Sequence, residues 1–112
     1  AGGRVNTSNW GTDIRFYTHP ESTSNVHYTY ERMKINSDGH LVPAASNTHD
    51  LGASALRWRN VYTTDLQLSN EGKTNDVDGT WGDYTVQEGE SDLFLINNRN
   101  GKKYKFNLSE VS

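Results

Sequence analysis

The sequence predicts an all-β fold in which short antiparallel hairpins follow one another along the chain. Asn, Ser, Thr and Gly supply 43 of the 112 residues, a composition typical of strands joined by tight turns. Two dipeptides, Asp38-Gly39 and Asn100-Gly101, stand between runs rich in β-branched and aromatic residues, and they favour the two-residue turns of hairpins. No stretch has the apolar spacing of a long helix. We therefore expect strands and turns throughout.

The hydrophobic core of a single chain is expected to be thin. Leu, Ile, Val and Phe together number 21 of 112 residues, which is few for a folded domain. The net charge of only −3, the three Trp and the six Tyr nevertheless favour folding over disorder. A small domain buries only roughly 60–65 % of its unfolded surface even when monomeric. We therefore expect partner subunits to supply the missing burial, with a small polar monomer as the alternative.

Composition also disfavours several partners. The chain has no cysteine, hence no disulfide and no thiolate metal site. It has no apolar run of membrane-spanning length and no signal peptide, so we expect neither membrane insertion nor secretory export. The basic cluster of Lys102, Lys103 and Lys105 is offset by acidic neighbours, so no nucleic-acid partner is expected. The start at Ala1 without a Met suggests a piece of a longer protein.

The first half of the chain contains the first predicted hairpins. Asp13–Thr18 and Val26–Ile35 are rich in aromatic and β-branched residues and read as strands, separated by a polar connection that contains Pro20. Asp38-Gly39 is the signal for a type I′ turn, because both central positions of that turn need positive φ. A two-residue turn at this point opposes Ile35 to Val42.

The middle of the chain is predicted to combine one helical turn with a longer strand. Ser54–Trp58 is too short for an independent helix but fits a single turn with Ser54 as N-cap. Arg59–Leu68 reads as a strand with imperfect alternation, since Leu66 and Leu68 share the face of Tyr62 while Val61 opposes it. A strand that crosses between subunits and is buried on both faces accounts for this pattern.

The last part is predicted to be a loop followed by three strands. Residues 70–82 are rich in Gly, Asn and Asp and read as a loop, and Tyr84–Gln87 reads as a short strand. Asp92–Asn97 and Lys102–Leu108 form the strongest hairpin signal. It places Leu93 and Leu95 on the same side as Tyr104, Phe106 and Leu108. We expect two modules, residues 1–71 and 72–112, divided near Gly72.

A candidate binding site surrounds Trp81 in the predicted loop. A flat aromatic ring can stack on the apolar face of a sugar while nearby carboxylates accept hydrogen bonds from its hydroxyls. The candidate ligand-binding residues are Trp81, Asp76, Asp78, Asp83 and Tyr84. The alternative is that Trp81 belongs to the core of the C-terminal module.

No metal, cofactor or catalytic residue is predicted. Thr74–Gly79 has the alternating oxygen donors of half a calcium loop, but Thr74 and Thr85 occupy the first and last ligand positions of that pattern. The paired carboxylates, such as Glu88 and Glu90, lie in no apolar setting that would separate their pKa values. The serines lack a GxSxG nucleophile pattern. The chain is therefore not expected to be an enzyme.

Two segments resemble the tail-fibre and tail-spike proteins of bacteriophages. One runs Asp50-Leu51-Gly52-Ala53-Ser54, then Arg57-Trp58-Arg59-Asn60-Val61-Tyr62 and Asp65-Leu66, and the other is Glu31–Gly39 with its pattern Arg-Met-x-Ile-x-x-x-Gly. The resemblance extends from about Asp13 to the C-terminus and is strongest over 31–70. Ser91-Asp92 departs from the self-cleaving chaperone of some fibres, because a strand-like segment follows it.

The resemblance implies an intertwined β-structured homotrimer in the tail of the virion, joined to other fibre segments and bound to a glycan or protein receptor on the host cell surface. In such a fibre-tip trimer the expected packing residues are Trp58, Tyr62, Leu66, Leu68, Leu93, Leu95, Tyr104 and Phe106. Two alternatives remain at this point. One is a monomeric carbohydrate-binding β-sandwich from a glycan-active enzyme, and the other is a structural spacer of the virion without a ligand.

Overall fold

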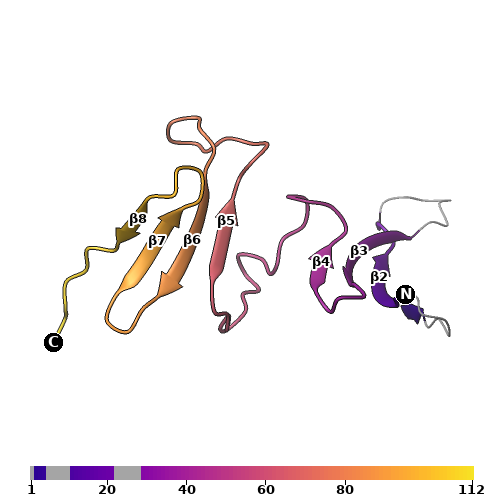
Figure 1. Cartoon of the computed structure of the whole chain (residues 1–112). Coiled ribbons are helices and arrows are strands. Elements are labelled where there is room, and N and C mark those ends of the chain that lie inside the picture. The colour runs from indigo at the N-terminus through magenta and orange to yellow at the C-terminus, as the bar shows by residue number, and fades with distance from the viewer. Residues whose placement is uncertain (1, 5–10, 22–28) are drawn as a thin grey trace. The chain divides into compact units, whose positions relative to one another are not determined.

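The chain is all-β, as predicted, and its strands form two antiparallel sheets. The structure is a computed structural model that describes residues 2–4, 11–21 and 29–112 (Figure 1). Within these ranges every regular element is a strand, and there is no helix. The chain divides into two compact units, residues 1–57 and 58–112, and each unit contains one four-stranded sheet.

The first sheet has the order β1-β2-β3-β4, with every neighbouring pair antiparallel. Its strands are β1 (Gly2–Arg4), β2 (Asp13–Thr18), β3 (Tyr30–Ile35) and β4 (Leu41–Pro43). The predicted bounds of β2 are confirmed. The strand predicted for Val26–Ile35 is confirmed from Tyr30 onward, while Thr29 lies outside it and residues 26–28 lie outside the described part of the chain.

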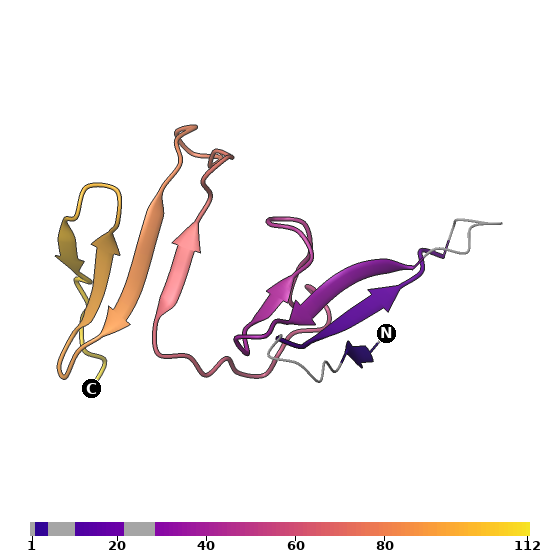
Figure 2. The ribbon, with the colours of Figure 1, turned by 45° about the vertical axis from the view of Figure 1, so that its right-hand side comes forward.

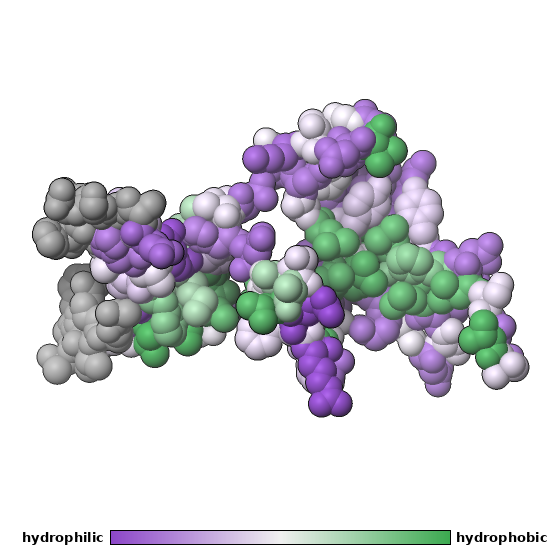
Figure 3. Space-filling view, turned by 180° about the vertical axis from the view of Figure 1, so that it is seen from behind, coloured by the Kyte–Doolittle hydropathy of each residue, from purple (hydrophilic) through white to green (hydrophobic). Residues whose placement is uncertain are grey.

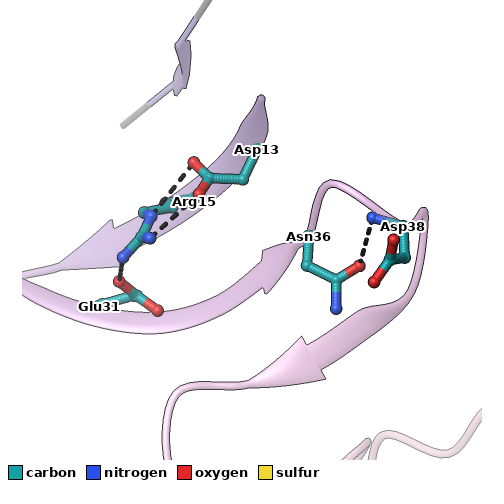
Figure 4. Close-up of polar contacts among 5 residues, drawn as sticks. All are labelled: Asp13, Arg15, Glu31, Asn36 and Asp38. Carbon is teal, nitrogen blue, oxygen red and sulfur yellow. Dashed lines mark hydrogen bonds and ion pairs between the residues drawn. The ribbon is translucent and has the colours of Figure 1, made fainter. Parts of the chain in front are cut away.

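Arg15 links the two central strands of this sheet. Its Nη1 donates to Glu31 Oε1 at 2.7 Å, and its Nε and Nη2 donate to the two carboxylate oxygens of Asp13 at 3.2 and 3.0 Å (Figure 4). The bonds to Asp13 first, and then those to Glu31, raise the pKa of Arg15 above its ordinary value. The pairs lie at a partly exposed surface, so they favour the β2–β3 register more than they add stability.

The turn between β3 and β4 has three residues, so the two-residue turn predicted at Asp38-Gly39 is wrong. Asn36 N donates to His40 O at 2.9 Å, and only Gly39 takes a positive φ, of 89°. The side-chain oxygen of Asn36 accepts from the backbone N–H of Asp38 at 3.0 Å (Figure 4). It also accepts from the backbone N–H of His40 at 3.0 Å. Ile35 therefore opposes Leu41 instead of Val42.

The segment that follows β4 corrects two further predictions. Ser54–Trp58 forms no helical turn, because Ala53 and Leu56 exchange backbone hydrogen bonds of 3.0 and 3.1 Å around a tight turn. The strand predicted for Arg59–Leu68 begins only at Leu66. A strand needs a paired neighbour to satisfy its backbone groups, and residues 59–65 have none within the described part of this chain.

The second sheet has the order β5-β6-β7-β8, again antiparallel throughout (Figures 1 and 2). Its strands are β5 (Leu66–Ser69), β6 (Asp83–Glu88), β7 (Leu93–Asn97) and β8 (Lys103–Lys105). β5 and β6 pair on either side of the predicted module boundary near Gly72, so that position lies inside one unit, and the compact units divide at Arg57–Trp58. The predicted loop, residues 70–82, connects these two strands.

The turn between β7 and β8 is longer than the two-residue turn predicted at Asn100-Gly101. Asn97 N donates to Lys102 O and Gly101 N donates to Asn97 O, both at 2.8 Å, with Gly101 at a φ of 76°. Ile96 consequently opposes Lys103. The predicted sharing of faces is confirmed for four of the residues, because Leu95 opposes Tyr104 and Phe106 N donates to Leu93 O. The strand predicted for Lys102–Leu108 is shorter, Lys103–Lys105, and Leu108 lies beyond it.

Each sheet has one apolar face that its own unit leaves open. In the first sheet this face carries Ile14, Phe16, Met33, Ile35 and Leu41. In the second, the apolar face carries Leu66, Leu68, Tyr84, Val86, Leu93, Leu95, Tyr104 and Phe106. Figure 3 shows hydrophobic residues, in green, gathered on the surface of the second sheet in the right-hand half of the view. None of the described hydrophobic side chains is buried, so the described residues of neither unit form a hydrophobic core.

The residue that is buried among the described ones is polar. Thr85, at 6 % exposure, lies on β6 on the opposite face of the second sheet. Its hydroxyl donates to Gln67 Oε1 on β5 at 2.7 Å and accepts from Asn98 Nδ2 at 2.9 Å. On this face hydrogen bonds between polar side chains, instead of contacts between buried apolar ones, therefore connect the neighbouring strands.

Candidate functional site

The loop that carries Trp81 is organised by the side chains of two asparagines and one aspartate. Asn70 Oδ1 accepts from Gly82 N at 2.7 Å, which closes the base of the loop. Asn75 Oδ1 accepts from the N–H groups of Val77 and Asp78 at 2.7 and 2.9 Å. Short polar side chains often form such local bonds to backbone in turns. The oxygen-rich sequence that resembled half of a calcium loop thus bonds to itself.

Asp78 has one carboxylate oxygen fully engaged inside the loop. Its Oδ1 accepts from Thr80 Oγ1 at 2.7 Å, from Asn75 Nδ2 at 2.8 Å and from Thr80 N at 3.1 Å. The bonds from Thr80 first, and then that from Asn75, lower the pKa of Asp78 below its ordinary value. Asp78 is therefore a fixed negative charge near neutral pH.

Trp81 stacks against an arginine that the sequence analysis did not single out. The Arg99 guanidinium carbon lies 3.8 Å from the centre of the Trp81 ring, and Arg99 Nη1 donates to Trp81 O at 3.0 Å. Trp81 is half-buried. Arg99 belongs to the β7–β8 turn, which lies at the same end of the sheet as the loop of residues 70–82 (Figure 1). Antiparallel pairing of successive strands puts these two connections at the same end of the sheet. The predicted strand order could therefore have indicated that Arg99 lies near Trp81.

Two hollows share the Trp81 and Tyr84 rings. The first measures about 480 Å³ and is lined by Leu68, Ser69, Asn70, Asn75, Asp78, Thr80, Trp81, Gly82 and Tyr84. The second measures about 440 Å³ and is lined by Thr80, Trp81, Gly82, Tyr84, Asn97, Arg99 and Asn100. Both volumes lie within the roughly 300–1,000 Å³ of ordinary ligand sites. Asp78 gives the first hollow a negative charge, and Arg99 gives the second a positive one.

The five predicted ligand-binding residues are therefore only partly brought together. Trp81, Tyr84 and Asp78 line the first hollow. Asp76 and Asp83 line neither hollow, and Asp83 Oδ1 instead accepts from Asn98 Nδ2 at 3.0 Å. The Tyr84 side chain is held by its hydroxyl, which accepts from Asn97 Nδ2 at 3.2 Å.

The predicted packing residues are all left open to some degree within the chain. Trp58 and Tyr62 are 64 % and 92 % exposed. Leu66, Leu68, Tyr104 and Phe106 are 36–49 % exposed, and Leu93 and Leu95 are half-buried. All but the first two lie on the apolar face of the second sheet, so this face is a second candidate for function, as a contact surface.

Other kinds of site find no support in the described residues. They contain no group of three or more His, Asp or Glu that could hold a metal ion. They also form no helix of the length and hydrophobicity that crossing a membrane requires.

The sequence was compared with models of protein families, with curated proteins and with solved structures, and none of these comparisons gave a match.

Proposed function

We propose that this chain is a segment of a bacteriophage tail fibre, in which three copies cover one another's apolar sheet faces and the assembled segment attaches to the host surface. The observation that carries the proposal is the absence of any buried hydrophobic side chain among the described residues. A chain that has ordered strands and no core needs a partner to cover its apolar groups.

The open sheet faces carry the apolar groups that such a partner would cover. Leu66 and Leu68 on the second sheet are 48 % and 49 % exposed, and Ile14 and Leu41 on the first are 43 % and 60 % exposed. Association of copies would remove these side chains from water.

The choice of three copies and of a phage fibre is supported by the sequence resemblance. The segment from Leu51 to Tyr62 carries the fibre-like pattern, and its large apolar side chains are 64–92 % exposed. A segment with this much exposed apolar surface fits between neighbouring copies of an intertwined fibre. The proposed mechanism is attachment and force transmission, with no bond made or broken, and three linked sites raise the strength of a weak contact.

The alternatives have less support. A β-sandwich encloses a core between two packed sheets of one chain, so this alternative predicts the native mass of a monomer. The spacer hypothesis differs from the proposal only in lacking a receptor. No observation favours either alternative over the fibre.

The experiment that tests the proposal is a measurement of native mass by sedimentation equilibrium at micromolar concentration, followed by a binding assay on bacterial cells. We expect a mass three times that of the chain and saturable binding that unlabelled protein competes away. A stable, folded monomer would refute the trimer. A trimer without any surface binding across a panel of host strains would favour the spacer.

A further inference from the structure

We propose that the second hollow, beside Trp81, binds a saccharide that carries an anionic substituent, and that Arg99 selects for the negative charge. The inference builds on the proposed attachment to a host surface and specifies the ligand. It departs from the sequence prediction, in which aspartate carboxylates accept hydrogen bonds from the hydroxyl groups of a sugar.

The first step is that Arg99 is held in place with its charge unneutralised. Stacking on Trp81 and the bond to Trp81 O fix the guanidinium plane. Among the residues that the structure describes, no acidic side chain forms an ion pair with Arg99. An arginine presents five N–H donors, and the contacts above occupy one of the Arg99 donors. The remaining donors suit a carboxylate or a phosphate, and a fixed side chain loses little entropy when it binds one.

The second step is that the walls around Arg99 suit a sugar ring. Tyr84 supplies aromatic surface, and Asn97 and Asn100 supply amide groups, while Arg99 covers one face of the Trp81 ring. Tyr84 is held by its bond from Asn97 and by close contact with Gly82. A Cβ added at Gly82 would lie 2.9 Å from Tyr84 Cε2, so this ring position depends on the glycine. Aromatic surface next to polar amides is the combination that recognises a pyranose.

The third step is the opposite charge of the two hollows. Asp78 lines the first hollow and remains ionised near neutral pH, so an anionic group is repelled from that hollow. Arg99 lines the second hollow. An uncharged sugar gains nothing from this division, whereas an anionic sugar is oriented by it.

The test is binding of the full chain, in its native oligomeric state, to an array of uronic-acid, sialic-acid and phosphorylated oligosaccharides, each printed beside its uncharged counterpart. We expect at least one acidic saccharide to bind at least tenfold more tightly than its counterpart, and titration calorimetry in solution to reproduce that ratio. Whether the carboxylated or the phosphorylated probes bind identifies the source of the charge.

The variants are Arg99→Gln and, as a matched control, Arg32→Gln. Arg32 also lies over an aromatic ring, that of Tyr30, and its Nε donates to Thr18 Oγ1, but it belongs to the other unit. We expect Arg99→Gln to weaken binding at least tenfold and Arg32→Gln to leave it unchanged. Arg99→Lys keeps the charge without the planar fork and should fall between Arg99→Gln and the parent chain.

The inference is overturned if no acidic saccharide binds, if uncharged counterparts bind equally well, or if both Gln variants lose affinity to the same extent. Its failure is separable from failure of the trimer, because native mass is measured on the same samples. A trimer that ignores acidic saccharides overturns this inference alone. A monomer that binds them through Arg99 overturns the trimer and leaves the site.

Discussion

Replacing Leu66 and Leu68 together by threonine should dissociate the proposed trimer without unfolding the second sheet. The two leucines are on β5, on the open apolar face, and are 48 % and 49 % exposed within the chain. Threonine is β-branched, as strands favour, so the substitution does not lower the local preference for β structure. The change therefore acts mainly on the surface that we assign to the contact between copies.

The size of the effect follows from the exposed fraction. Fully burying a leucine side chain contributes roughly 1.5–3 kcal/mol, so covering the remaining half contributes about 1 kcal/mol. Two such side chains in each of three copies amount to about 6 kcal/mol per trimer. At about 1.4 kcal/mol for each factor of ten, the trimer dissociation constant should rise about 10⁴-fold.

Sedimentation equilibrium over a range of concentrations measures this change, and far-UV circular dichroism checks that strand content is retained. Val77→Thr is the control, because Val77 is 95 % exposed in the loop of residues 70–82 and lies off the apolar face. The reasoning is refuted if the double variant remains as trimeric as the parent chain. It is equally refuted if Val77→Thr dissociates the trimer as strongly.

Three further predictions concern local features. Gly39→Ala should lower the free energy of unfolding by about 1–2 kcal/mol in thermal melts, because Gly39 has a φ of 89°, and an unchanged melting temperature would contradict this. Asn36→Ala should cost about 1 kcal/mol through loss of two bonds to the β3–β4 turn, with Asn107→Ala, at an exposed position, as a comparison in the same melts. The lowered pKa of Asp78 means that its contribution to the loop is present above pH 3.8 and is lost as the pH falls further. The Thr80 amide proton, followed by NMR, should therefore titrate with a midpoint below 3.8, and a midpoint at or above that value would argue against the bonding of Asp78.

The two hairpin turns show what sequence alone can and cannot predict. Asp-Gly and Asn-Gly correctly marked where the chain reverses, but both loops are longer than predicted, because only the glycine of each pair takes a positive φ. At the first turn the register differs by one residue, which moves Leu41 onto the face expected for Val42. At the second it differs by two, and an even difference leaves every side chain on its predicted face.

The candidate site was only partly predictable for a related reason. Trp81 and Tyr84 were identified because aromatic residues next to a polar loop are conspicuous in sequence. Arg99 is 18 residues from Trp81 and meets it only because two antiparallel connections share one end of the sheet. The role of Asp83 was also hidden, since its bond to Asn98 depends on the β6–β7 pairing. Contacts of this kind depend on topology, which local patterns do not specify.

The polar chain through Gln67, Thr85 and Asn98 has a consequence for the order in which such a protein would be built. The hydrogen bonds between these hydroxyl and amide groups form in one strand register only, so a lone polypeptide can align its own four strands. If three such polypeptides then associate, each brings a sheet whose strands are already aligned, and the rate-limiting step is their association. Dilution would delay that step, while leaving the alignment inside each copy untouched.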